Sequence, residues 1–327
     1  MNFYISTFSN KKFLSIVFVI TLFFVIIQFI VLEYYTREKM VVMDEQTKSL
    51  ISKHNYKLAL LGTSHTNYGQ EMNQIDSEMF DYGSAYTYPI IMYQKIKKLI
   101  DLNPNLKYLL VEADYHQFYE FSFTDSSIYT EYAFLLKGIE TGNENLFYSL
   151  NREIAPTLHE KILLSIKSRI MGLGKSEKDV TKKEGDWSRL TQSVRNKTNM
   201  GRYNFFKFTN DKKMNKNSVD YYQKTIELAQ KNNIEVILIR HPLSNEYLGN
   251  MYENMKIDVE QYLNILSKQY NLKILDFRYI FKNKQELFSN QDHLNTNGQK
   301  EFSKILVNEI KSKIKNYELN TILSTEN

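Results

Sequence analysis

Short apolar runs alternate with longer amphipathic stretches in two parts of the chain. The apolar runs cover residues 58–61, 79–84, 106–111, 235–239 and 273–277. Each run is too short for a helix and is bounded by polar residues or glycine, which is the pattern of buried strands in a parallel sheet. The amphipathic stretches that predict helices cover residues 89–102, 218–231, 257–270 and 297–314. Strands that alternate with helices predict an α/β fold with a parallel sheet and right-handed crossovers.

Residues 117–215 interrupt this alternation. They contain stretches with helical periodicity around 130–139, 158–171 and 186–194 and a Lys-rich run at 175–186, but no convincing strand. We predict a helical insertion packed beside the sheet, with the Lys-rich run as a mobile loop. Two interpretations carry equal weight: the insertion covers the active site or docks a membrane partner, or its helices simply widen the core.

Residues 13–32 form an uncharged apolar run of about the twenty residues that a helix needs to cross a bilayer. A cleaved signal peptide would have a shorter apolar core and a cleavage site between small residues, and residues 31–39 offer no such site. Lys11 and Lys12 precede the run without acidic neighbours, so the positive-inside rule favours a cytoplasmic N-terminus. We therefore predict a single-pass protein of the cell membrane with an extracytoplasmic domain.

The same patterns predict how the chain is divided. At 327 residues, of which 43% are hydrophobic, it is long enough for a domain with a substantial core. We expect a cytoplasmic N-terminus (1–12), a transmembrane anchor (13–32), a stalk (33–55), an α/β domain built from 56–116 and 216–315, a helical insertion (117–215) and a polar tail (316–327).

Charge and composition narrow the range of functions. The 42 basic and 37 acidic side chains give a net charge of only +5, and no basic groove or zinc-finger spacing is present, so a nucleic-acid partner is not expected. The absence of cysteine excludes disulfides, thiolate metal sites and a cysteine nucleophile, and it fits an extracytoplasmic location. No His, Asp or Glu cluster has metal-ligand spacing, and no phosphate loop or dinucleotide motif occurs, so we expect neither a metal nor another cofactor.

Ser64 is the first candidate for chemistry. It follows the predicted strand at 58–61 in a Gly-Thr-Ser-His turn, which places its hydroxyl at the carboxyl end of the sheet. Ligands of open α/β sheets bind at that edge, and the first N–H groups of a following helix can stabilise an oxyanion there. The alternative is that Ser64 only caps the helix expected to begin near His65.

His293 is the second candidate. A serine hydroxyl is a weak nucleophile and needs a nearby base, usually a histidine that a third group orients. His293 lies in the polar loop at 290–298, directly before the last predicted helix. Two polar loops at strand-to-helix junctions can face each other across one sheet edge, so His293 could serve Ser64.

The segments 62–65 (Gly-Thr-Ser-His) and 292–295 (Asp-His-Leu-Asn), with Gly298, resemble the first and last blocks of the SGNH/GDSL hydrolase superfamily. The resemblance is closer to its membrane-anchored branch, which includes the D-alanyl transfer proteins of teichoic acid operons and the alginate O-acetylation proteins. It covers residues 57–113 and 216–312 and implies an SGNH-like, flavodoxin-like sheet flanked by helices. For this chain the expected fold adds the helical insertion and the transmembrane helix.

The resemblance also assigns residues around the serine. It implies that the amide of Gly83 helps to form the oxyanion hole, although a glycine needed for a turn with positive φ is an equal local explanation. The Gly-x-Asn block of the superfamily has no asparagine here, because residues 112–116 read Glu-Ala-Asp-Tyr-His. The oxyanion hole would then lack one donor or take it from another residue.

The third member of the triad departs from the family pattern as well. The superfamily has Asp-x-x-His, but the residue three places before His293 is Asn290. Asp292 could serve through a backbone rearrangement, Asn290 could orient the ring without a charge, or the site could be impaired. We assign Asp292 and keep Asn290 as the alternative.

Three further polar residues follow predicted strands. His65, Asp114 and His241 are placed to line the crevice and contact substrate. His116 lies at the same edge as Asp114, but an exposed loop is the commoner explanation for this pair. The proline after His241 argues equally for a plain structural turn.

These observations leave three functional hypotheses. The first is a serine acyltransferase or esterase that acts on a cell-envelope polysaccharide or other polymer; the resemblance implies a multi-spanning membrane-bound O-acyltransferase as its partner. The second is a deacetylase of the same fold. The third is a non-catalytic scaffold or glycan-binding subunit of an export or modification complex. Ser64 and His293 favour the first two, whereas the missing asparagine of the Gly-x-Asn block and the missing aspartate at 290 favour the third.

Overall fold

A computed structural model describes residues 10–53, 55–66, 78–84, 87–119, 186–205, 209 and 211–313. The chain divides into two compact units, residues 1–47 with 125–174 and residues 48–124 with 175–327. The sheet and the candidate site belong to the second unit. The helical stretches predicted at 130–139 and 158–171 lie outside the described residues, as does the tail at 316–327.

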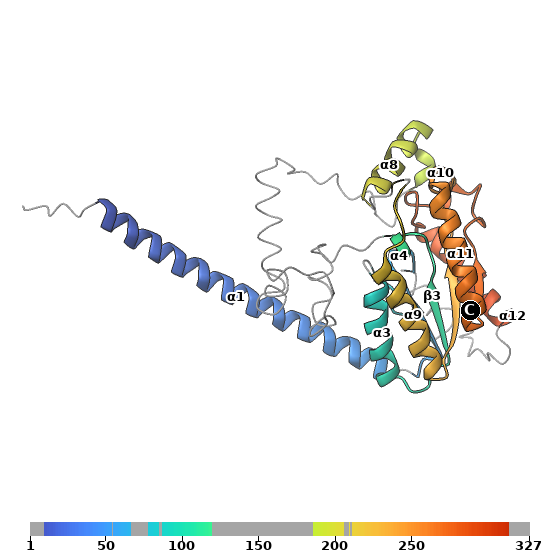
Figure 1. The fold of residues 1–327 in the computed structure, drawn as a ribbon, viewed down its shortest axis with the longest axis horizontal. Coiled ribbons are helices and arrows are strands. Elements are labelled where there is room, and N and C mark those ends of the chain that lie inside the picture. The colour runs from blue at the N-terminus through green and yellow to red at the C-terminus, as the bar shows by residue number, and fades with distance from the viewer. Residues whose placement is uncertain are drawn as a thin grey trace, which may run out of the picture. The chain divides into compact units, whose positions relative to one another are not determined.

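The N-terminal helix α1 covers Asn10–Lys53 and includes the apolar run (Figure 1). Large apolar side chains along this run, such as Phe18 and Ile30, are exposed. Among the helices of the described residues, none is identified as both long and apolar enough to be a membrane span. The anchor assigned to residues 13–32 stays a prediction.

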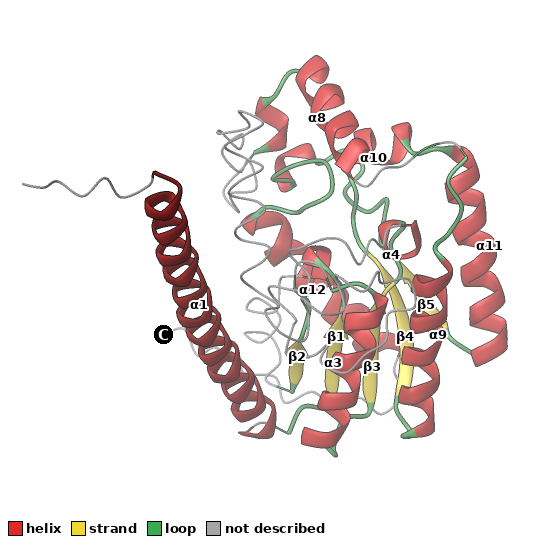
Figure 2. Ribbon diagram, turned by 60° about the vertical axis from the view of Figure 1, so that its left-hand side comes forward, coloured by secondary structure: helices red, strands yellow, loops and turns green. Residues whose placement is uncertain are grey.

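Five parallel strands form the sheet, in the order β2-β1-β3-β4-β5 (Figure 2). The strands are β1 (Leu58–Leu61), β2 (Met79–Asp81), β3 (Tyr108–Glu112), β4 (Glu235–Arg240) and β5 (Lys273–Asp276). All five were predicted, and the expected parallel sheet flanked by helices is confirmed. Apolar runs mark these strands because both faces of the sheet are covered.

Alternate residues of each strand pack on opposite faces of the sheet. On one face, Ala59 and Leu61 join the core formed with α3 (Pro89–Leu102), α9 (Lys216–Lys231) and α11 (Glu253–Tyr270). On the other face, Leu58 and Leu60 pack in the core formed with α12 (Thr296–Lys313). The helices therefore cover both faces and leave the carboxyl edge of the sheet for loops.

The described residues of the second unit also contain shorter elements. They are the 3₁₀ turns η1 (Ser64–Thr66), η2 (Trp187–Arg189) and η3 (Gln285–Leu287) and the helices α4 (His116–Tyr119), α8 (Gln192–Phe205) and α10 (Asn245–Asn250). Trp187 is fully buried in the α12 core, and Arg195 pairs with Glu246 at 2.7 Å. The described end of the predicted insertion therefore packs on the α/β domain, and both interpretations of the insertion stay predictions.

The strand order reverses between β1 and β3, and the loops after these two strands therefore separate. In open α/β sheets such a switch point creates the ligand crevice. The chain turns sharply here at Gly62, where an added Cβ would lie 2.2 Å from Thr66 Cγ2 and 2.3 Å from Glu112 Oε2. Only glycine fits this close approach, and it sends the chain directly into the turn that carries Ser64.

Candidate active site

Ser64 and His293 meet at the carboxyl edge of the sheet. The Ser64 hydroxyl lies 2.7 Å from His293 Nε2, although 229 positions separate the two residues along the chain. Ser64 is half-buried, and the His293 side chain is 18% exposed. A serine in hydrogen-bond contact with a partly accessible imidazole is the arrangement that activates a hydroxyl nucleophile. The turn that carries Ser64 is a 3₁₀ helix over Ser64–Thr66, and the helix of the capping alternative would fall on residues 67–77, which lie outside the described residues.

The other ring nitrogen of His293 faces two oxygens. Nδ1 lies 3.0 Å from Asn290 Oδ1 with hydrogen-bond geometry, and 3.0 Å from Asp292 Oδ1 as an ion-pair contact. Asn290 Oδ1 also accepts the backbone N–H groups of His293, at 2.8 Å, and Asp292, at 3.1 Å. Asn290 therefore holds the ring and its loop, whereas Asp292 brings a carboxylate to the same nitrogen.

The loop that carries His293 is anchored from both sides. Ser289 N–H donates to His293 O at 2.9 Å, and Phe288 and Leu294 form an isolated antiparallel bridge. Asn295 Nδ2 donates to Glu286 O at 2.6 Å. These backbone contacts fix the position of the imidazole before any substrate arrives, which limits the entropy lost in the reaction.

His65 lies behind the serine and not in an open crevice. Its Nδ1 lies 2.8 Å from Asp114 Oδ2, and its Nε2 lies 3.4 Å from Asp292 Oδ2. Burial disfavours the charged ring, but the hydrogen bonds to Asp114 and Asp292 and the nearby charge of Glu112 outweigh it and raise the pKa of His65 to about 10. His65 is therefore protonated at neutral pH.

Asp114 is shared by two histidines. Its Oδ2 lies 3.0 Å from His241 Nδ1, and its Oδ1 accepts the His241 backbone N–H at 3.1 Å. Burial alone would raise its pKa, but His241 and His65 hold the pKa of this carboxyl well below its usual range. Asp114 is 1% exposed and His241 is 2% exposed. The predicted substrate contact of Asp114, His241 and His65 does not fit this burial; all three support the site from behind.

Glu112 and His116 belong to the same network; His116 was expected beside Asp114 at the sheet edge, whereas Glu112 was not predicted to take part. Glu112 Oε1 lies 3.0 Å from His116 Nε2 and accepts the Thr63 hydroxyl at 2.9 Å. Glu112 Oε2 accepts the Thr63 backbone N–H. Burial raises and His116 lowers the pKa of Glu112, with a net lowering. Three ionisable residues at alternate positions 112, 114 and 116, directly after a buried strand, were the signal that could have revealed the cluster.

The amide of Gly83 forms a hydrogen bond within its own loop. The amide donates to Asp81 Oδ1 at 2.7 Å. An added Cβ would lie 1.7 Å from Thr66 Oγ1, and the backbone is not in the left-handed region. Lys95 braces the same loop by donating to Tyr82 O at 2.8 Å. Close approach to Thr66, and not a positive φ, explains the need for glycine here, and the oxyanion role of Gly83 stays a prediction.

Two groups of donor atoms lie close enough together to hold a metal ion. The first comprises His65, Glu112, Asp114 and His241, the second His65, Asp292 and His293, and the atoms of each group lie within 4.8 Å of one another. The expectation that no such cluster has ligand spacing is corrected, because separate segments of the chain supply these residues. The contacts between the atoms themselves, at 2.8 to 3.4 Å, already form a hydrogen-bond network.

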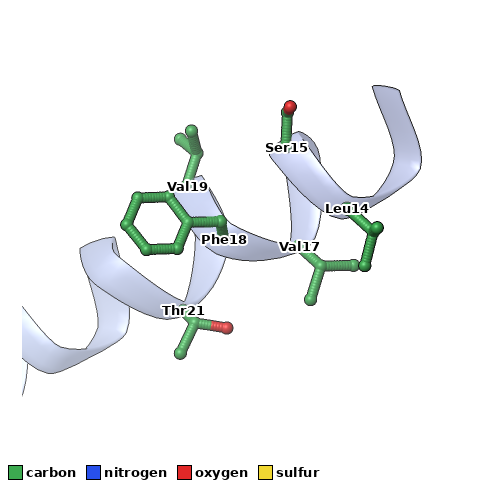
Figure 3. A pocket seen from close by; sticks show the side chains of 6 residues that line it. All are labelled: Leu14, Ser15, Val17, Phe18, Val19 and Thr21. Carbon is green, nitrogen blue, oxygen red and sulfur yellow. The ribbon is translucent and has the colours of Figure 1, made fainter. Parts of the chain in front are cut away.

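A hollow in the first unit is unrelated to this site. It lies on α1 and is lined by Leu14, Ser15, Val17, Phe18, Val19 and Thr21 (Figure 3). Its side chains are apolar or carry a hydroxyl, and none can act as a base near neutral pH. The chemistry of the described residues is therefore concentrated at the sheet edge.

Comparisons with known proteins add little to this geometry. A protein-family model matches residues 178–315, which is less than half of the chain and does not define its family. No curated protein matches the chain. The chain is similar to the crystal structure of a protein described as a candidate acylhydrolase from Bacteroides fragilis, with 9% identity and a TM-score of 0.37, over 78% of this chain and 86% of that chain. It is also similar to a GDSL-like lipase from Bacteroides thetaiotaomicron, with 8% identity and a TM-score of 0.38, over 80% of this chain and 90% of that chain. At this distance the likenesses carry no conclusion about chemistry.

Proposed function

We propose that this protein is a serine-dependent acyl-transfer enzyme, an esterase or O-acyltransferase. The observation that carries the proposal is the 2.7 Å contact between Ser64 Oγ and His293 Nε2. Asn290 and Asp292 on the far side of the ring complete the functional parts of a catalytic triad. A merely structural serine would not need an oriented, partly accessible histidine.

The proposed reaction has two steps. Ser64 Oγ attacks the carbonyl carbon of an acyl ester while its proton passes to His293 Nε2, and the charged ring then protonates the departing alkoxide. The acyl group remains on Ser64 as an ester. Water or an acceptor hydroxyl next attacks that ester, His293 takes the proton of the attacking group, and the same proton returns to Ser64 Oγ.

Asn290 and Asp292 support the positive charge that His293 carries between these proton transfers. Asn290 Oδ1 fixes the ring through its hydrogen bond to Nδ1. Asp292 is buried and places a carboxylate oxygen 3.0 Å from the same nitrogen. A negative charge in a dry site stabilises an imidazolium more strongly than it would in water.

We further propose that the acyl group belongs to a cell-envelope polysaccharide or related polymer and that a multi-spanning membrane-bound O-acyltransferase is the partner. The SGNH-like motifs at 62–65 and 292–295 support this proposal. A membrane anchor at 13–32, with the domain outside the cytoplasm, is part of it. The exposed apolar side chains of that segment are its support. Release of the protein from membranes by carbonate extraction would contradict the anchor.

Hydrolysis of p-nitrophenyl acetate by the purified full chain tests the proposed chemistry. We expect turnover that Ser64→Ala abolishes and that the matched control Ser312→Ala retains, because Ser312 only bonds Glu309 O on α12. Equal turnover in Ser64→Ala would exclude Ser64 as the nucleophile. An O-acetylated polymer, supplied with or without an acceptor glycan, then separates a transferase from the alternative deacetylase, because only a transferase moves the acetyl group to the acceptor.

A further inference from the structure

Asp292 is held between two histidines of different exposure. Its Oδ1 lies 3.0 Å from Nδ1 of the partly accessible His293. Its Oδ2 lies 3.4 Å from Nε2 of the buried His65. The other nitrogen of His65 contacts Asp114 Oδ2 at 2.8 Å. The His65 ring thus bridges a carboxylate that follows β3 and a carboxylate that precedes α12.

This bridge defines the protonation state of His65. A neutral imidazole has one N–H and can donate to only one carboxylate, whereas an imidazolium donates from both nitrogens. The acidic groups facing the ring are Asp114, Asp292 and, at 3.8 Å, Glu112. The rings of His116, His241 and His293 lie with their centroids 4.6, 6.2 and 5.2 Å from its own. Three buried carboxylates around one ring favour its cationic form.

We propose that His65 is a positioning residue of the acyl-transfer site, whose cation keeps Asp292 ionised and turned toward His293. His65 does not reach the reacting atoms itself; it acts through Asp292. The inference rests on the proposed function of Ser64. Two residues then share the role of the third triad member. Asn290 orients His293, and Asp292, which His65 holds, supplies the negative charge.

The same arrangement gives Asp114 and His241 a role in supporting His65. Asp114 holds the far side of the His65 ring and is itself held by His241. Both histidines are buried and contact the same oxygen of Asp114, but the described contact to Asp292 comes from His65. His241 is therefore a matched control for His65.

Two substitutions separate a positioning role from a structural one. His65→Gln keeps a side chain that can donate hydrogen bonds but removes the positive charge, and His241→Gln makes the same change one step further from Ser64. We would measure p-nitrophenyl acetate hydrolysis by the full chain in detergent across the pH range in which histidine titrates. For His65→Gln we expect kcat to fall about 10- to 100-fold with KM within about twofold, and for His241→Gln a fall of less than about threefold.

The pH dependence of kcat/KM distinguishes a positioning role from a loss of folding. Without the cation behind it, Asp292 takes up a proton more readily and the site loses its negative charge at a higher pH, so the acidic limb of kcat/KM should move to higher pH in His65→Gln and stay in place in His241→Gln. An unchanged limb and kcat in His65→Gln would overturn the positioning role. If wild type hydrolyses no ester and a fluorophosphonate leaves Ser64 unmodified, the proposed function fails first and the role of His65 fails with it.

A measurement without turnover tests the same point. Nitrogen-15 NMR of histidine-labelled full chain should show both ring nitrogens of His65 protonated at pH 8. A neutral His65 at that pH would overturn the proposal. So would a stoichiometric divalent metal that is bound by wild type and lost in His65→Gln, because Nδ1 would then be a ligand and could carry no proton.

Discussion

The polar residues at the sheet edge form two regions with different roles. The open side contains Ser64 and His293, and the closed side contains the buried residues around His65 and Asp114, namely Glu112, His116 and His241. On the open side, His293 contacts Ser64 and is 18% exposed. On the closed side, His65 and Asp114 are 1% exposed at their side chains and contact each other at 2.8 Å. A histidine beside a carboxylate and a hydroxyl is found on both sides, because the Thr63 hydroxyl lies 2.9 Å from Nε2 of His116. His116 is buried, however, whereas the His293 ring that contacts Ser64 is partly exposed.

His293 and His65 differ in their access to solvent, and this difference distinguishes a histidine that acts as a base from one that stays charged. His293 must gain and lose a proton in each cycle, so it cannot be locked in one protonation state. The buried bridge between two carboxylates holds His65 in its charged form, and the pKa of about 10 removes it from proton transfer at neutral pH. The closed side therefore supplies rigidity and charge, and the open side supplies chemistry.

Changes on the open side should have the largest effect. Ser64→Ala and His293→Ala should each lower ester hydrolysis by about 10³-fold or more, because nucleophile and base act as one unit. The double variant should lose no more than either single one. Thermal melting should stay near that of wild type. If the double variant instead loses activity by the product of the two single losses, Ser64 and His293 do not act as one unit.

The two supports of His293 should have intermediate effects that differ in kind. Asn290→Ala removes the hydrogen bond to Nδ1 and should lower kcat by about tenfold or more, whereas Asn290→Asp should stay within about threefold. Asp292→Asn removes the charge and should lower kcat by about 10- to 100-fold.

Parallel kinetics of these three variants with p-nitrophenyl acetate check this prediction. If Asn290→Ala and Asp292→Asn are both silent, the assignment of the third triad member is wrong. If only Asn290→Ala is silent, Asp292 supplies both orientation and charge. If only Asp292→Asn is silent, Asn290 orients the ring and a carboxylate is not needed.

The closed side should make stability depend on pH. The pKa of His65 rises from 6.5 to about 10 on folding. Its contribution is therefore fully present below about pH 6.5 and is lost as the pH rises toward 10. The melting temperature of wild type should fall by about 5 °C or more between pH 7 and pH 10, and His65→Gln should show a clearly smaller fall. Parallel slopes for the two proteins would contradict a buried cation at this position.

The smallest effect on catalysis is expected from His116, which contacts Glu112 and the Thr63 hydroxyl on the closed side. His116→Gln loses the contact with Glu112, and we expect a loss of about 1–3 kcal/mol in the free energy of unfolding. Ester hydrolysis at a temperature well below melting should change by less than about threefold. Denaturant unfolding and steady-state kinetics measure both quantities. A loss of activity larger than that of Asp292→Asn would erase the distinction between the two sides.

Much of the fold could be predicted from the sequence because both faces of the sheet are buried. The strand at Leu58–Leu61 and the helix at Pro89–Leu102 have the predicted bounds, and the other strands differ by a few residues at their ends. The six-residue helix Asn245–Asn250 was not predicted. It is too short to show a helical period, and its start depends on the Ser244 side chain, which accepts the Tyr247 N–H at 3.2 Å.

The candidate site could be predicted only in part. Ser64 and His293 were selected because each follows a recognisable pattern, and the structure brings them together. His65, Asp114 and His241 were correctly placed at the carboxyl edge of the sheet. They were expected to line an open crevice, but they are buried. A polar residue after a strand has the same pattern whether it lines a crevice or packs beneath it, and only the packing of β1, β3 and β4 decides which.

Labelling with a serine-reactive fluorophosphonate tests the central claim most directly. The full chain would be treated in detergent at neutral pH, digested and mapped by mass spectrometry. We predict one major adduct, on Ser64, that is lost in His293→Ala and retained in His241→Gln. An unmodified Ser64 in wild type, or a Ser64 adduct that forms equally fast without His293, would contradict an activated serine at this sheet edge.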